Sequence, residues 1–412
     1  MAHQQSCHYD KVPPMSQILA MAQRIESLEK DLSQSNPAQA GAEGCEPLES
    51  SLQRQTPIPS GVGLSSSSNT AMTAQHYSPV FPTTSAVQEP MQGDAETATL
   101  PTPQSSEVLV SDPEQISLWE TRALEACSEQ LRIPLAKVKH LFRTYWTWIY
   151  PAFMFVSRPV MLRNMATGSG AYKSALLSSA ICLHATRFTD HTLGEELHAH
   201  VRFLLGREMH DGPSVPLVQA LLQLSARELG LGLLHQAWLY SGMAFRLISD
   251  MGILNKTSTP NTHDPSEEHA LGQLGWSCYL WDKAVSLYLG RMPSLPEPPM
   301  FEPTVLDGHI EYEQWSPYYG PEQHGNKMNN GNNLCHPTPA LGATCFVNFC
   351  KLGPIIHEIL ATLYAKKPDP NMLPFVQTTM LRLETWRSES PAELRYDGRS
   401  TTCPPPHVLS QK

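Results

Sequence analysis

The chain has 412 residues, of which 41% are hydrophobic and 17% charged, and its formal net charge at pH 7 is -10. This length suits one large domain or two ordinary ones. Because an acidic chain repels phosphate groups, the composition excludes a nucleic-acid-binding surface that extends over the whole molecule, and any contact with DNA needs a local basic module.

The nine cysteines are scattered, and no two of them form a C-x-x-C pair. An odd number without framework spacing indicates reduced thiols in an intracellular protein. The N-terminus lacks the charged-then-apolar pattern of a signal peptide. No uninterrupted apolar run reaches the length of about 18 residues that a membrane-spanning helix needs. We therefore expect no membrane span.

Composition divides the chain into five segments. Residues 1–14 form a short N-terminal piece, and residues 15–35 have helical periodicity. Residues 36–110 are rich in Ser, Thr, Pro, Gln and Gly. They predict a disordered linker, because they bury too little apolar surface to offset the chain entropy. Residues 111–303 have the pattern of consecutive helices, and residues 304–412 hold a polar loop, further helices and a Pro-rich end.

The segment 15–35 predicts a short amphipathic helix. Its apolar residues recur at spacings of three and four, which is the a and d seam of a coiled coil over two heptads. Arg24 then falls at g and Glu29 at the following e, a charge pair that suits a parallel dimer. So short a seam equally fits a lone amphipathic helix that lies on a folded core. The candidate dimerisation residues are Ile18, Met21, Ile25, Leu28 and Leu32.

Helical spacing continues through residues 111–303. Asp112 and Pro113 suit the cap and first residue of a helix. Gly252 and Gly290 follow two later apolar stripes, as glycines do at helix C-termini. We find no convincing strand alternation, so the predicted fold class is all-α, with helices packed in pairs around a single core. The stripes are Leu135, Val138, Phe142, Tyr145 and Ile149; Tyr172, Ala175, Ser179, Cys182 and Thr186; Leu217, Leu221 and Leu224; Ala237, Tyr240, Ala244, Leu247 and Met251; and Leu271, Leu274, Cys278, Trp281 and Val285.

Residue types suited to catalysis or metal binding do not form a known motif. The sequence has no G-x-x-x-x-G-K-[ST], H-E-x-x-H or G-x-S-x-G pattern. The densest titratable cluster is GEELHAH, in which His198 and His200 stand two apart and so point in different directions on a helix. A solvated helix face explains this cluster better than a metal site. Cys345 and Cys350 lie on an apolar helix and fit small core side chains.

Three segments carry a resemblance to a known family. They are LFRTYWTWIYPAFMFVSRPVML at 141–162, AWLYSGMAFRLISDMGI at 237–253 and GWSCYLWDKAVSLYLGRMPSLPE at 275–297. In this order they resemble the middle homology region of fungal binuclear zinc-cluster transcription factors, also called the fungal-specific transcription factor domain. The match spans about residues 131–299, and CFVNFCKLGPIIHEILATLY and LETWRSESPAEL look like later parts of the same region.

The resemblance places the family motif on residues of the second and third segments. Lys283 stands where the family has Arg after Asp282, which is a mild departure. We expect Gly242 to permit a close helix crossing and the two later motif glycines to end helices in a left-handed conformation. We expect Arg246 and Arg291 to pair with carboxylates or helix-end carbonyls inside the fold. The motif residues are Gly242, Arg246, Asp250, Gly252, Trp281, Asp282, Gly290 and Arg291.

The N-terminus departs most from the family pattern. The stretch CHYDKVPP, from Cys7 to Pro14, resembles the last cysteine of a binuclear zinc cluster and the linker after it, and the 15–35 helix resembles the family's dimerisation coil. One thiol cannot build a zinc site, which needs about four ligands per ion. We expect no cofactor in this chain, and zinc only where a complete cluster is encoded upstream.

The resemblance implies a nuclear transcription regulator that controls a specific gene set or metabolic pathway and is not an enzyme. It implies a homodimer or heterodimer, contact with promoter DNA through a full-length form or a partner, and no membrane. Two alternatives stay open. One is a cofactor-like regulator that does not bind DNA and dimerises with full-length partners. The other is an all-α enzyme of a metabolic gene cluster, which would need a pocket with converging titratable side chains.

Overall fold

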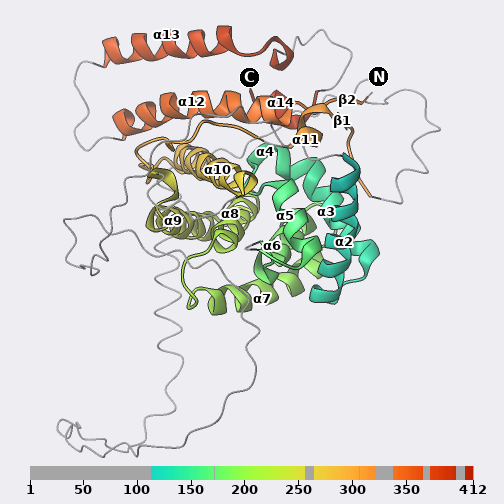
Figure 1. The fold of residues 1–412 in the computed structure, drawn as a ribbon. Coiled ribbons are helices and arrows are strands. Elements are labelled where there is room, and N and C mark those ends of the chain that lie inside the picture. Colours follow the sequence, from blue (N-terminus) through green and yellow to red (C-terminus); the bar gives the residue numbers. More distant parts are fainter. Residues whose placement is uncertain are drawn as a thin grey trace, which may run out of the picture. The chain divides into compact units, whose positions relative to one another are not determined.

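The structure of the chain is a computed structural model, and the residues that it describes are 113–170, 172–255, 264–305, 307–320, 337–364, 372–395 and 404–411. All of them belong to one compact unit, residues 71–412. Cys7, the expected coil at 15–35 and the expected linker at 36–110 lie outside the described residues. Within those residues the fold is helical apart from two short strands, which confirms the predicted all-α class (Figure 1).

Helix α3, a π-helical turn and α4 follow one another without a break, so this helical run changes its pitch. The π-helical turn follows directly on α3 and leads into α4. Pro151 lies in the first turn of α4. Because proline has no N–H to donate back along the helix, the backbone widens at the turn before it. Met154 ends the run in a left-handed conformation with φ of 46°. The elements are α2 (Pro113–Leu131), α3 (Leu135–Thr144), the π-helical turn (Tyr145–Ile149), α4 (Tyr150–Phe153) and α5 (Arg158–Thr167).

The middle helices begin at side chains that cap them. Ser174, Asp190, Ser214 and Asp264 each accept a hydrogen bond from a backbone N–H in the first turn of the helix that follows. Such caps satisfy N–H groups that have no partner inside the helix. The elements are α6 (Ala175–Thr186), α7 (His191–Glu208), α8 (Val215–Gly230), α9 (Leu234–Asp250), a 3₁₀ turn (Ile253–Asn255) and α10 (Pro265–Leu289).

Helix α6 lies at the centre of this packing. All its residues except the first are buried, and it contacts α2, α3, α7 and α8. A helix surrounded on every side has no polar face. The weak amphipathicity of its sequence therefore follows from its central position.

The last elements pack on the helices that precede them. Strands β1 and β2 pair antiparallel, with Gln314 opposite Pro339. Helix α12 contacts α4 and α10 on one side, and α13 lies along α12 (Figure 1). Thr379 is the buried residue of α13. The elements are α11 (Gly308–Tyr312), β1 (Gln314–Trp315), β2 (Thr338–Pro339), α12 (Gly342–Leu363), α13 (Leu373–Glu389), a 3₁₀ turn (Ala392–Leu394) and α14 (Pro406–Leu409).

The segment around β1 is fastened to the π-helical turn by two indoles. Trp148 donates a hydrogen bond from Nε1 to the Tyr318 carbonyl oxygen at 2.6 Å. Trp315 donates from Nε1 to the Thr147 carbonyl oxygen at 3.1 Å. The two indoles also meet edge to face, with ring centroids 5.5 Å apart. This segment is thus tied to a part of the chain that is distant in sequence.

The apolar stripes predicted from the sequence form the core. Among the stripe residues, Val138, Phe142, Leu221, Ala244 and Cys278 are fully buried. Cys345 and Cys350 are also buried, each 1% exposed, as their apolar helix predicts. The exceptions are partly buried and pack against the core; they are Leu135, Ala175, Tyr240 and Leu247.

Helix α12 is the one described helix that is long and apolar enough, by length and composition, to cross a membrane. A core helix of a soluble protein passes the same test. In this fold α12 contacts α4, α10, α11, α13 and α14, and one third of its most apolar window is buried.

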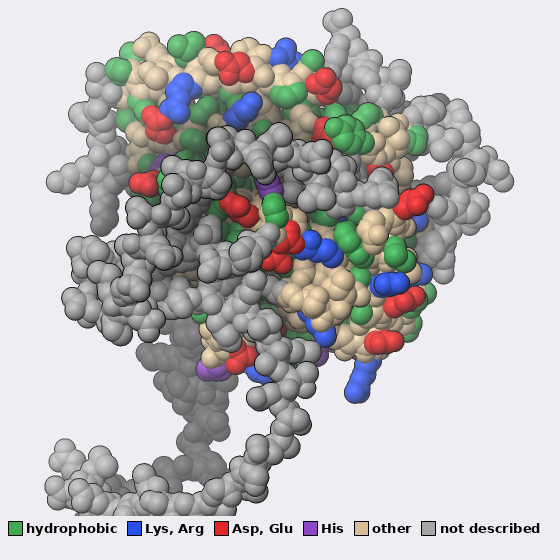
Figure 2. All heavy atoms as spheres, viewed as in Figure 1, with side chains coloured by type: hydrophobic (Ala, Val, Ile, Leu, Met, Phe, Trp, Pro, Cys, Tyr) green, Lys and Arg blue, Asp and Glu red, His purple; other side chains and the backbone are tan. Residues whose placement is uncertain are grey.

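Charged side chains are mixed in sign on the face of the molecule that carries α12 and α13. In Figure 2, Lys and Arg alternate with Asp and Glu and with hydrophobic side chains over these helices, at the top of the view. Neither sign forms a continuous patch among the coloured residues of that view. The coloured residues of this face therefore do not form the continuous basic surface that a phosphate backbone attracts.

Candidate functional site

The Asp282 carboxylate, about two turns before the end of α10, holds the chain segment that follows the helix. Asp282 is fully buried. It accepts hydrogen bonds from the backbone N–H groups of Ser294 and Leu295, both at 2.9 Å. The Lys283 ammonium donates to Asp282 at 2.8 Å and also to the Leu295 carbonyl oxygen. One buried ion pair thus satisfies three polar groups of the backbone.

We call residues 291–301 the strap, because this segment turns at the end of α10 and returns along the helix. The turn needs Gly290, whose φ of 65° places it in the left-handed region. Trp276 donates from Nε1 to the Phe301 carbonyl oxygen at 2.7 Å. A Cβ at Gly272 would meet the Phe301 ring at 3.2 Å. The small residue on α10 therefore allows the strap to lie against the helix.

The ion pair beneath the strap is desolvated. Burial lowers the pKa of the Lys283 ammonium, and the Asp282 carboxylate opposes this change. The Lys283 Nζ atom also lies 3.9 Å from the centroid of the Tyr279 ring, a cation–π contact. Burial raises the pKa of the Tyr279 hydroxyl, as does Asp282. Asp282 and Lys283 pair with each other and with the backbone of the strap, so their role is structural. We call these two residues the clamp.

A second buried polar chain joins three helical segments. Gln223 on α8 donates from Nε2 to the Tyr145 hydroxyl at 2.5 Å and accepts at Oε1 from His184 Nδ1 at 2.8 Å. Burial lowers the pKa of His184 to about 3, and the nearby Arg187 and Arg227 lower it further while the bond to Gln223 raises it. Burial raises the pKa of Tyr145. His184 is therefore neutral and positions α6 against α8.

Two predictions for the motif residues on α9 are wrong. A Cβ at Gly242 would meet no atom within 4 Å, so this glycine does not permit a close helix crossing. Arg246 is exposed, so it does not pair inside the fold. The two residues are four apart and share an outward face of α9, because the buried face carries Ala237, Ala244 and Ile248.

For the other motif residues, from the end of α9 to just after α10, some predictions are confirmed and one is wrong. Gly252 and Gly290 both have φ of 65°, as predicted for left-handed helix ends. Trp281 is 6% exposed and lies in the core. Arg291 does not pair inside the fold, which corrects the prediction. It is exposed, and its guanidinium lies 4.8 Å from the Trp238 ring centroid. Asp250 is half-buried.

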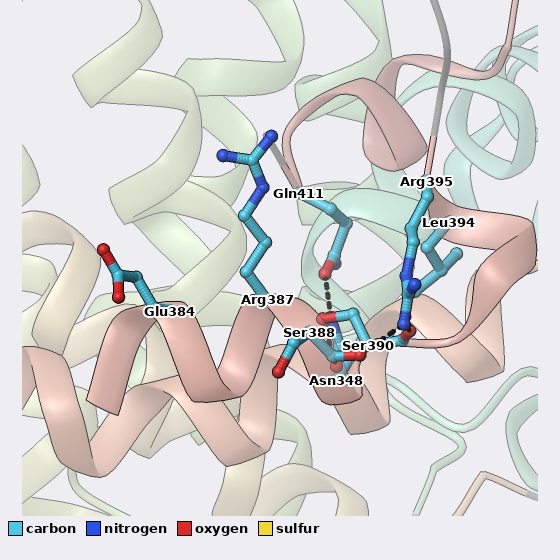
Figure 3. A pocket seen from close by; sticks show the side chains of 8 residues that line it. All are labelled: Asn348, Glu384, Arg387, Ser388, Ser390, Leu394, Arg395 and Gln411. Carbon is cyan, nitrogen blue, oxygen red and sulfur yellow. Dashed lines mark hydrogen bonds between the residues drawn. The ribbon is translucent and has the colours of Figure 1, made fainter. Parts of the chain in front are cut away.

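A cavity of about 360 Å³ opens beside α13, and its lining residues come from four parts of the chain (Figure 3). Glu384 and Arg387 extend from the same side of α13 in this view. The lining residues are Asn348 of α12, Glu384, Arg387 and Ser388 of α13, Ser390, Leu394 and Arg395 of the segment after it, and Gln411 near α14.

The polar groups at the bottom of this cavity hold one another in place. Asn348 is 3% exposed. It donates from Nδ2 to the Ser390 hydroxyl at 3.1 Å and to Gln411 Oε1 at 2.7 Å. Gln411 donates in turn to the Cys345 carbonyl oxygen at 3.0 Å. We call Asn348, Ser390 and Gln411 the amide floor.

Sequence reasoning named Asp282 as a motif residue, but it predicted neither the clamp nor the cavity residues. LETWRSESPAEL contains Glu384, Arg387 and Ser390, but the sequence gives no sign that Gln411 and Asn348 join them. For the clamp a signal was present, since Asp282 precedes a Gly-Arg turn and the Pro-rich segment SLPEPP. When the chain turns back at Gly290, the backbone N–H groups of this segment come within reach of Asp282.

Residues 143–300 match the family model of the fungal specific transcription factor domain. The nitrogen assimilation transcription factor nit-4 of Neurospora crassa is 28% identical over 280 residues, which cover 62% of this chain and 25% of that protein. The nitrogen assimilation transcription factor nirA of Emericella nidulans is 26% identical over 275 residues, covering 62% of this chain and 30% of that protein. An uncharacterized transcriptional regulatory protein of Schizosaccharomyces pombe is 27% identical over 266 residues, covering 61% and 41%.

The chain spans between 25% and 41% of the length of these three relatives. No solved structure matches it. The region 143–300 runs from the end of α3 to the strap. The clamp, the His184 chain and all the motif residues therefore lie inside the matched domain, whereas the cavity beside α13 lies outside it.

Proposed function

We propose that this chain, which carries a fungal specific transcription factor domain at residues 143–300, regulates the transcription of a specific gene set or metabolic pathway from the nucleus. The observation that carries the proposal is the match of that domain together with relatives named as transcription factors. Two of those relatives are named for nitrogen assimilation. For this chain we propose only that it has a specific gene set or pathway, and we assign no individual genes.

The same proposal gives the chain a partner. Its net charge of -10 disfavours unassisted binding to DNA. We therefore propose that it reaches promoter DNA through a longer form or through a partner chain, by a homodimer or heterodimer that uses Ile18 to Leu32. Zinc belongs to the form or partner that carries a complete cluster.

A non-enzymatic and non-membrane role is part of the proposal. The buried ion pair of Asp282 and Lys283 forms its other hydrogen bonds with the backbone of the strap. Helix α12, although long and apolar, contacts five other helices. Both features suit a folded regulatory module.

The test is disruption of the gene, followed by transcript measurement, together with a reporter assay. For the reporter, the full chain is fused to an unrelated DNA-binding module. We expect a defined set of transcripts to change on disruption, and the fusion to change reporter output several-fold. A fusion carrying Trp281→Ala, which damages the core, serves as the control that should lose the effect. Unchanged transcripts together with an inert fusion would refute the proposal.

A cofactor-like regulator remains the second candidate, because the described residues contain no basic module. The two candidates differ in the direction in which overexpression changes the transcripts. If the chain sequesters full-length partners, its overexpression lowers the transcripts that those partners activate, and Ile25→Asp abolishes this effect.

A further inference from the structure

We propose that the cavity beside α13 binds a small organic anion that carries a carboxylate, with Arg387 and Arg395 as its recognition residues. The cavity measures about 360 Å³, and four parts of the chain line it. Sites for small molecules span about 300–1,000 Å³. This volume admits a metabolite of a few carbon atoms and excludes a nucleic acid or a folded partner.

The charges that line the cavity favour an anion. Arg387 and Arg395 contribute two positive charges and Glu384 one negative charge, while the other lining residues are uncharged. The local balance is therefore positive by one charge, in a chain whose formal net charge is -10. A guanidinium presents two parallel N–H groups, which match the two oxygens of a carboxylate.

The Arg395 guanidinium is fixed before any ligand arrives. Its Nε donates to the Ser390 carbonyl oxygen at 3.0 Å, and its Nη2 donates to the same oxygen at 2.7 Å and to the Ser388 carbonyl oxygen. Within the described residues, no hydrogen bond uses Nη1. Because its orientation is already set, the Arg395 side chain loses little conformational entropy when it binds a ligand.

The Arg387 guanidinium has no carboxylate partner among the described residues. It extends from α13 on the side of the cavity, three residues after Glu384 on the same helix (Figure 3). Arg382, by contrast, is on the same helix but pairs with Glu358 of α12 and lines a separate cavity of about 400 Å³. The two arginines therefore differ in what they are free to bind.

The neutral lining completes the specificity. The amide floor is preorganised by its own hydrogen bonds, so it does not collapse into the cavity. The Glu384 carboxylate lines the same cavity and can accept a hydrogen bond from a hydroxyl or amino group of the ligand. The ligand class is therefore a small hydroxy acid or amino acid, with one carboxylate on the arginines.

The claim that this ligand is the effector of a regulator rests on the proposed function. Its binding does not, because it is a property of the purified chain. A chain that binds the anion but alters no transcript leaves the binding site standing and removes the regulatory role. A chain that alters transcripts but binds no anion removes the binding site alone.

Isothermal titration of the full chain tests the proposal, with malate, glutamate, inorganic phosphate and glycerol as probes. We expect malate or glutamate to bind with a Kd of about 0.1–1 mM, a range that suits so few ligand atoms. Arg387→Gln should weaken that binding about tenfold or more. The matched control Arg382→Gln should change it less than about twofold.

Three outcomes would overturn the proposal. The first is no heat with malate or glutamate at millimolar concentrations. The second is equal loss of binding in Arg387→Gln and Arg382→Gln, which would mean that α13 has merely shifted. The third is phosphate binding that matches or exceeds malate and depends on Arg387, which would assign the cavity to phosphate. Circular dichroism of both variants confirms that each is folded before titration.

Discussion

Trp281 of α10 donates a hydrogen bond from its indole Nε1 to the Ser225 hydroxyl of α8 at 2.9 Å. Ser225 donates in turn to the Ala237 carbonyl oxygen of α9 at 2.8 Å. The same indole meets Phe153 edge to face, with ring centroids 5.3 Å apart. One side chain thus joins three helices by polar contacts and a fourth by its ring.

Replacing Trp281 by Ala should lower the free energy of unfolding by about 3–5 kcal/mol, because it leaves a cavity where a large side chain is buried. Trp281→Phe keeps most of the ring contact and loses only the N–H group, so we expect a cost of about 1–2 kcal/mol. Denaturant unfolding measures both. An unchanged midpoint for Trp281→Ala would mean that this residue faces solvent or a partner.

Removing the Asp282 carboxylate should be among the most damaging single changes. Asp282→Ala leaves the Lys283 ammonium buried without its partner, at a cost of about 3–5 kcal/mol. It also frees the N–H groups of the strap, so trypsin should cut faster after Arg291. The double variant Asp282→Leu with Lys283→Met removes both charges and should recover part of the stability. If the single and double variants unfold alike, the buried charge is not the cause.

Gly242→Ala should stabilise the chain. A Cβ there meets open space, and Ala is better than Gly in a helix interior by about 0.5–1 kcal/mol. Gly272→Ala is the contrasting variant, because its Cβ would press on the Phe301 ring at 3.2 Å and displace the strap. We expect the two changes to have opposite signs in denaturant unfolding. Destabilisation by Gly242→Ala would reveal a close neighbour at that face.

The neutral His184 makes stability depend on pH. Its pKa is about 3 in the folded chain and about 6.5 in the unfolded chain, so the unfolded state binds more protons between these values. The free energy of unfolding therefore falls as pH falls below about 6.5, by about 2 kcal/mol between pH 7 and pH 5 from this residue. His184→Gln should remove that part of the slope, while substitution of the exposed His191 should not. Parallel pH curves for wild type and His184→Gln would contradict this origin.

The predicted dimer seam lies outside the described residues and stays a prediction. Ile25→Asp places two like charges at the centre of the seam, where each loses hydration without gaining a partner. We expect this variant to sediment as a monomer at concentrations where the wild type is a dimer, with the helical domain still folded. A wild type that is monomeric at tens of micromolar, or a variant that stays dimeric, would assign the helix to another surface.

The helices could be predicted from local patterns of apolar residues. The stripes at Leu217 and at Leu271 became α8 and α10, since a buried helix face needs apolar residues at its own period. Gly252 and Gly290 were placed correctly because a left-handed helix end favours glycine, which has no Cβ, whatever the rest of the fold. The π-helical turn was missed because its cause, Pro151, only removes one backbone donor and leaves the apolar spacing intact.

Contacts between distant residues could not be predicted in this way. Gln223 meets His184 39 residues away and Tyr145 78 residues away in the chain. No periodicity records such pairs. The prediction for Arg246 failed for a related reason, since an arginine on an amphipathic helix can face solvent or a partner helix, and only the packing of α9 decides between them. The residues around Arg387 come together through the packing of α13 on α12, where Asn348 bonds to Ser390, and through the return of the chain at Gln411.

The clamp beneath the strap also sets an order of events during synthesis. Asp282 and its two N–H donors are 12 and 13 residues apart, so this contact can close as soon as the strap leaves the ribosome. The indoles of Trp148 and Trp315 find acceptors 170 and 168 residues away. At about 5–20 residues per second, Trp148 emerges roughly 10–30 s before its acceptor. For that interval the Trp148 indole lacks its Tyr318 acceptor and the Trp315 ring that it meets, so this aromatic contact cannot form until the segment around β1 has been synthesised.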